Sequence, residues 1–103
     1  MEGYILLLED NKYYVGISGN LTERLHNHFN NDGITNGSSW TRKYKPIKVI
    51  EYFIGTKEKE KIKTLEYMKM YGWENVRGAG WTALKIVCPI CLRTGATQTP
   101  LIN

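Results

Sequence analysis

The chain has 103 residues, of which 42% are hydrophobic, so it is long enough for one compact domain with its own core. Its 14 basic and 10 acidic residues give a formal charge of +4 and a pI of about 9.1, a mild excess that suits a polyanionic partner without proving one. No apolar run could span a bilayer and no basic stretch opens a signal peptide, so we expect an intracellular protein of the cytoplasm or nucleus.

The sequence begins with a predicted β-hairpin. Apolar, β-prone residues occupy Tyr4–Leu8, the pair Asp10–Asn11 is typical of a turn, and β-prone residues resume over Tyr13–Ile17. Each strand carries a tyrosine, Tyr4 in the first and Tyr14 in the second. Taken alone, each is an ordinary half-buried aromatic residue of a strand.

An amphipathic helix is predicted next, ending near Asn30. Asn20, with Glu23 three residues later, resembles a helix cap. Apolar residues then recur at every fourth position: Leu21, Leu25 and Phe29. Arg24 and His28 lie one turn apart at the border of this stripe, so we expect their polar ends to face one cleft. Taken alone, Arg24 also fits a solvated helix arginine.

The second half of the chain predicts a loop and two further elements. Residues 31–39 are rich in glycine, asparagine and serine and predict a loop. A third strand is expected over Lys48–Ile54 and a second helix over 57–71, capped by the threonine before it and stopped by the glycine after it. The segment 73–80 is expected to be irregular, and 82–87 fits a short helix or a strand.

Glu66 is the anomalous residue of the second predicted helix. It falls within an apolar arc made of Ile62, Leu65 and Met70. The other acids of this helix, Glu58 and Glu60, alternate with lysines in a stretch that fits a solvated face. A carboxylate on an inward face is costly unless it is paired or bound to a metal. The pattern therefore marks Glu66 as the candidate functional acid, with a structural ion pair to Arg24 as the alternative.

Together these residues resemble the signature of the GIY-YIG nuclease superfamily. Gly3-Tyr4-Ile5 corresponds to the first half of the motif and Tyr14-Val15-Gly16 to the second, in a common variant. By this resemblance Arg24, ten residues after Tyr14, matches the catalytic arginine of the family. His28 matches a further active-site position, and Glu66 matches the metal-binding glutamate.

The resemblance runs from Tyr4 to about Thr82 and implies an α+β fold, in which a small three-stranded antiparallel sheet is flanked by helices. Gly16 and Asn75 match positions that support the site structurally; the alternative for Asn75 is that it only ties down the following loop. We expect residues 1–87 to form the nuclease-like domain and 88–103 to form a short tail.

The resemblance implies a metal-dependent DNA endonuclease with structure-directed or low sequence specificity. Glu66 would hold one divalent ion, Mg²⁺ or Mn²⁺, and Arg24 would balance charge in the transition state. The proton of the attacking water would go to Tyr4, Tyr14 or His28, and we favour Tyr14 with His28 assisting. The alternative function is an inactive relative that binds nucleic acid or a protein partner with the same surface.

A basic segment without acids follows the predicted loop and is the candidate DNA-binding surface. It comprises Arg42, Lys43, Lys45 and Lys48, interleaved with Trp40 and Tyr44. The overlapping segment 37–46 is similar to a threonine–arginine loop of small stand-alone and junction nucleases. Basic side chains neutralise phosphates, and aromatic rings stack on unpaired bases. The alternative is a solvated strand entrance with Trp40 packed into the core.

The tail carries a lone CxxC motif, Cys88-Pro89-Ile90-Cys91, which is half of a tetrahedral zinc site. No second pair follows it, so a complete site would need His26, His28 or a second chain. We favour two packed cysteines in a proline-containing turn over a zinc site.

Overall fold

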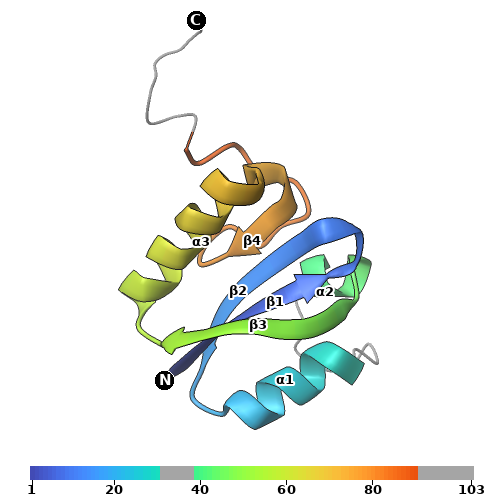
Figure 1. Ribbon diagram of the computed structural model, residues 1–103, viewed down its shortest axis with the longest axis vertical. Coiled ribbons are helices and arrows are strands. Elements are labelled where there is room, and N and C mark those ends of the chain that lie inside the picture. Colours follow the sequence, from blue (N-terminus) through green and yellow to red (C-terminus); the bar gives the residue numbers. More distant parts are fainter. Residues whose placement is uncertain (31–38, 91–103) are drawn as a thin grey trace, which may run out of the picture.

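A four-stranded sheet with helices on both faces organises the part of the chain that the computed structural model describes, residues 1–30 and 39–90 (Figure 1). The strands are β1 (Glu2–Leu8), β2 (Lys12–Ser18), β3 (Pro46–Ile54) and β4 (Val76–Gly78). The helices are α1 (Leu21–Asn30), α2 (Ser39–Lys43) and α3 (Lys57–Tyr71), with short 3₁₀ segments η1 (Glu9–Asn11) and η2 (Trp73–Asn75). Among these described residues, no helix is both long and apolar enough to cross a membrane.

The sheet confirms the α+β class but has four strands rather than the three expected. Its order is β3-β1-β2-β4; β1 pairs antiparallel with β2 and β3, whereas β4 pairs parallel with β2. The extra strand covers only Val76–Gly78, inside the segment expected to be irregular. Three residues are too few to show the alternation by which a strand is recognised in a sequence.

The predicted hairpin and both long helices are confirmed. The turn at Asp10 and Asn11 has φ angles of 59° and 57°, a left-handed conformation that these residue types tolerate. Asn20 caps α1 by accepting a hydrogen bond from the Glu23 amide at 3.1 Å. Thr56 caps α3 in the same way.

Two elements differ from the sequence prediction. The basic segment begins with the five-residue helix α2, and β3 starts at Pro46 rather than Lys48. Residues 82–87, expected to form a short helix or strand, form neither. The carbonyls of Ala83 and Leu84 in this segment accept hydrogen bonds from the Arg77 side chain instead. Most of the predicted loop, residues 31–38, lies outside the described residues.

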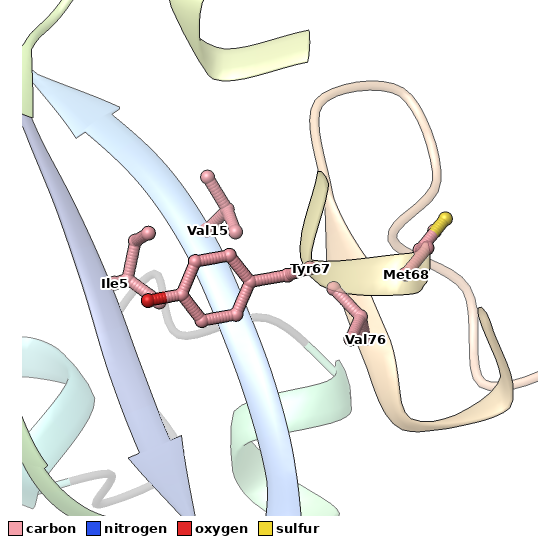
Figure 2. Packing of buried hydrophobic residues seen from close by; sticks show 5 residues of the cluster. All are labelled: Ile5, Val15, Tyr67, Met68 and Val76. Carbon is pink, nitrogen blue, oxygen red and sulfur yellow. The ribbon is translucent and has the colours of Figure 1, made fainter. Parts of the chain in front are cut away.

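Side-chain alternation along β1 and β2 builds an apolar core on each face of the sheet. On one face, Ile5 and Val15 pack against α3 and β4, and Figure 2 shows the Tyr67 ring extending from α3 toward these two residues. The other face carries the cluster Tyr4, Leu6, Leu8 and Trp40, with Leu21 and Leu25 of α1 packed on it. Tyr4 and Ile5 therefore point to opposite faces, and Tyr4 points toward α1.

Candidate active site

His28 forms hydrogen bonds through both ring nitrogens and is fully buried. Its Nε2 lies 2.9 Å from the Tyr4 hydroxyl, and its Nδ1 lies 3.2 Å from the Thr41 hydroxyl. Burial, with the positive charge of Arg24, lowers the pKa of His28 to about 4, so the ring is neutral at neutral pH. A neutral imidazole has one donor and one acceptor nitrogen, so both hydroxyls have a matching partner.

Gly16 leaves the space in which the Tyr4 phenol lies. The two residues are directly paired across β1 and β2, and a Cβ at Gly16 would lie 2.5 Å from the Tyr4 oxygen. Tyr14 adjoins them, with its ring centroid 5.1 Å from that of His28 and 6.4 Å from that of Tyr4. The structure therefore brings together Tyr4, Tyr14, Gly16 and His28, as the sequence predicted; their chemical roles stay predictions.

The charges of Arg24 and Glu60 both act on the buried Tyr4 hydroxyl. Burial is the main cause that raises the pKa of Tyr4, Tyr14 and Glu60 raise it further, and Arg24 lowers it. Arg24 is half-buried on α1, one turn before His28. Charged residues of α1 and α3 thus both influence the Tyr4 hydroxyl of β1.

Glu60 is a further candidate acid, which the sequence analysis placed on a solvated face. The side chain is half-buried; burial raises the pKa of Glu60, and a hydrogen bond from the Ala79 backbone opposes the rise. It lines a cavity of about 330 Å³ with residues that include Lys57 and Gly80. The alternation of lysine and glutamate over 57–63 fits a solvated helix face, so the sequence pattern gave no reason to select Glu60. The available signal was spacing, because Glu60 lies one helical turn before the buried Thr64.

The prediction that Glu66 lies on the buried face of its helix is wrong. Its side chain is 55% exposed, and its carboxylate lies 3.6 Å from the ammonium of Lys63 rather than against Arg24. Ile62 and Met70, which defined the expected arc, are exposed as well. The buried residues of α3 are instead Thr64, Tyr67 and Met68. The buried face of α3 is thus formed by a threonine, a tyrosine and a methionine rather than by the expected apolar arc, and the metal-binding role of Glu66 stays a prediction.

Asn75 joins η2 to neighbouring elements and is not part of the hydroxyl–imidazole cluster. Its Oδ1 accepts a hydrogen bond from Lys12 Nζ, and its Nδ2 donates one to the Tyr71 carbonyl, each at 2.7 Å. Lys12 opens β2, four residues before Gly16, so this contact lies toward the other end of the strand. These contacts bind Asn75 to β2 and to the end of α3 rather than to the following loop, and its role near the site stays a prediction.

Trp40 is buried, so the prediction that it stacks on a base is wrong and the core alternative is confirmed. It is 3% exposed, and its indole N–H donates to the Tyr13 carbonyl at 2.9 Å. Tyr44 is half-buried and packs edge-on against the Trp40 ring at 4.8 Å. The predicted phosphate-binding residues are all exposed: Arg42, Lys43, Lys45 and Lys48.

For the CxxC motif, the favoured pair of packed cysteines and the zinc alternative both stay predictions. Cys88 is buried, but Cys91 lies outside the described residues. His28 is already bonded to Tyr4 and Thr41. Within the described residues, no group of three or more histidine, cysteine, aspartate or glutamate side chains is placed to hold a metal.

A buried tyrosine–histidine pair under the influence of an arginine and a carboxylate is chemically capable of moving a proton. The family model of the GIY-YIG catalytic domain matches residues 3–70, about two thirds of the chain, and the chain belongs to this family. The matched range contains Tyr4, Tyr14, Arg24 and His28, together with both candidate acids, Glu60 and Glu66. Comparisons with curated proteins and with solved structures gave no match.

Membership defines the function at a general level. GIY-YIG domains are in general nuclease domains, so the chain has a nuclease-type function and a nucleic acid as its substrate class. Nucleases of this family typically use a divalent metal.

Proposed function

We propose that this chain is a divalent-metal-dependent endonuclease that hydrolyses phosphodiester bonds in DNA. The observation that carries the proposal is the environment of the Tyr4 hydroxyl. This group is 2.9 Å from a neutral imidazole nitrogen and lies within the electrostatic influence of both Arg24 and Glu60. Hydrolysis of a phosphodiester needs these three functions: a route for a proton, a cation for the phosphate and an acid for a metal.

Glu60 fits a single divalent cation. Its carboxylate is partly desolvated, which raises its pKa, and a bound cation would offset that cost. A site with one protein carboxylate suits Mg²⁺ or Mn²⁺, because Mg²⁺ keeps several of its waters and also binds phosphate oxygens. When bound, such an ion would supply charge neutralisation at the phosphate and at the leaving oxygen.

Arg24 is the proposed phosphate-binding residue. Its guanidinium is planar and permanently charged, so it can bind two phosphate oxygens at once. It lies on the same helix as His28, and its charge influences both His28 and Tyr4. Phosphate bound by Arg24 would therefore lie next to the hydroxyl–imidazole pair.

The proton from the attacking water is proposed to go to Tyr14, with His28 assisting. Tyr4 is the less suitable base, because burial raises its pKa and keeps the phenol protonated. It instead fixes the orientation of the imidazole from one side, while Thr41 does so from the other. Tyr14 is more exposed than Tyr4 and lies against the His28 ring.

Substrate recognition is proposed to be directed by the shape of the DNA. The exposed basic residues at the end of α2 and the start of β3 would neutralise phosphates, a contact that carries no base sequence information. The affinity should accordingly be modest and fall steeply as the salt concentration rises.

The test separates cleavage from binding. Supercoiled plasmid, a forked duplex and a four-way junction are incubated with the purified chain in Mg²⁺, in Mn²⁺ and in excess EDTA. We expect nicking in the presence of either metal and none in EDTA, with DNA binding retained in all three. Binding without cleavage in both metals would contradict the proposal and support the alternative, an inactive relative that acts as a binding module.

A further inference from the structure

A second cavity lies at the edge of the sheet formed by β2 and β4, separate from the residues around His28. Its volume is about 440 Å³. It is lined by residues of β2, α2, η2, β4 and the segment after β4, including Lys12, Lys43, Tyr44, Trp73, Arg77 and Lys85. Neither the family match nor the proposed hydrolysis assigns a role to it.

The cavity carries an excess of positive charge. Three lysines and Arg77 line it, against the single acid Glu74. Within the described residues, the Arg77 guanidinium makes five hydrogen bonds, and all of them end on backbone carbonyls. Because these acceptors are neutral, the buried charge of Arg77 adds to the positive potential of the cavity.

Aromatic rings stand beside these ammonium groups. The Nζ atoms of Lys12 and Lys43 lie 5.3 Å and 5.6 Å from the centroid of the Tyr44 ring. Trp73 is half-buried and adds an indole to the lining. Ammonium groups next to flat rings match the chemistry of a nucleotide, which presents a phosphate and a planar base.

Two elements connect this cavity to the candidate active site. In α2, Trp40 lines the cavity while the next residue, Thr41, bonds to His28. In β2, Lys12 lines the cavity and Tyr14, two residues later, packs against His28. The cavity and the hydroxyl–imidazole cluster therefore share two elements, with the cavity toward the Lys12 end of β2.

We propose that this cavity binds an unpaired nucleotide of the substrate, with its phosphate against the lysines and its base against Trp73. The inference rests on the proposed endonuclease function and specifies its substrate as DNA with a single-stranded segment beside the cleavage site. A fully paired duplex has no base free to enter a cavity of this kind.

The test measures binding in EDTA, so it does not depend on cleavage. Fluorescence anisotropy compares a forked duplex carrying unpaired arms with a fully paired duplex of the same length. We expect the wild-type chain to bind the forked duplex about tenfold more tightly, because stacking of one base on an aromatic ring contributes binding free energy of this order. The double variant Lys43→Gln/Lys85→Gln should lose this preference. The control Lys59→Gln/Lys69→Gln removes the same charge from exposed positions of α3 and should keep the preference.

Trp73 provides a second variant pair. Trp73→Phe keeps an aromatic ring and should retain the preference, whereas Trp73→Leu should lose it, with circular dichroism confirming the fold of both. The proposal would be overturned if the wild-type chain bound the two duplexes with equal affinity. It would also be overturned if Lys43→Gln/Lys85→Gln lost affinity equally for both duplexes. The proposal would also be overturned if polyglutamate displaced forked DNA as effectively as single-stranded DNA does. That result would assign the cavity to an acidic protein partner. If the preference is present but no plasmid is cut, the endonuclease proposal fails while the nucleotide site stands.

Discussion

At the scale of single residues, the site depends on how tightly Tyr4, Gly16 and His28 fit together. The signature tyrosine and glycine are not interchangeable parts of a motif: the glycine leaves the volume that the tyrosine ring fills. Sequence alone could predict which residues gather here because the motif gives both their order and their strands. It could not predict Thr41 as a partner of His28, since the contact bridges residues 31–38, for which the sequence predicts only a loop.

Gly16→Ala should displace the Tyr4 ring. The new Cβ would lie 2.5 Å from the Tyr4 oxygen and 2.6 Å from its ring carbon Cζ, so the phenol must move away from its place beside His28. We expect a loss of about 1–3 kcal/mol in the free energy of unfolding, measured by urea titration, together with loss of cleavage. Gly19→Ala is the matched control, because nothing lies within 4 Å of the position that its new Cβ would take. A Gly16→Ala protein as stable and active as Gly19→Ala would contradict this packing.

His28 should make stability depend on pH in the acidic range. The folded state has a pKa of about 4 at this residue and the unfolded state about 6.5, so the unfolded chain binds more protons between these values. The contribution of neutral His28 to the free energy of unfolding is therefore fully present above pH 6.5. It is lost as the pH falls through 4, by about 3 kcal/mol in total. Urea titrations across this window should show the slope in the wild type and in His26→Gln, and a weaker slope in His28→Gln. An unchanged slope in His28→Gln would show that another group is responsible.

At the scale of elements, the shortest helix and strand are the ones that the sequence does not predict. The sequence predicts both long helices and the hairpin, because caps, turn residues and periodicity mark them over many positions. It does not predict β4 or α2, which span three and five residues and are held by tertiary contacts. The same reason explains why Glu66 was expected on the inward face of its helix, because the buried residues of α3 are set by what packs on them.

Arg77 should stabilise the edge of the sheet at β4. Its guanidinium bonds to carbonyls on both sides of β4 and lies 4.2 Å from the centroid of the Trp40 ring. Arg77→Met should lower the free energy of unfolding by about 2–4 kcal/mol, since one buried and several partly buried carbonyls lose their donor. Amide exchange at Ala83–Lys85 should also accelerate. Lys69→Met, at an exposed position of α3, should leave amide exchange there unchanged and alter the free energy of unfolding by no more than about 0.5 kcal/mol. Equal effects of the two variants would contradict the role given to Arg77.

At the scale of the whole molecule, the sheet separates two functions. The face under α1 carries the hydroxyl–imidazole cluster, and the other face supplies the core that packs against α3, the helix that carries Glu60. The position of Glu60 is thus set by the packing of Tyr67 and Met68 against the sheet (Figure 2). The exposed basic residues and the cavity beside β4 extend the proposed contact with DNA beyond the reacting atoms.

The most direct test of the account compares two glutamates on one helix. Glu60→Gln and Glu66→Gln each remove one carboxylate from α3, and plasmid nicking in Mg²⁺ is measured for both at matched DNA binding. We expect Glu60→Gln to lose cleavage by at least about 100-fold, and Glu66→Gln, whose side chain is exposed beside Lys63, to cut at close to the wild-type rate. Cleavage that survives in Glu60→Gln and disappears in Glu66→Gln would contradict the site described for this chain.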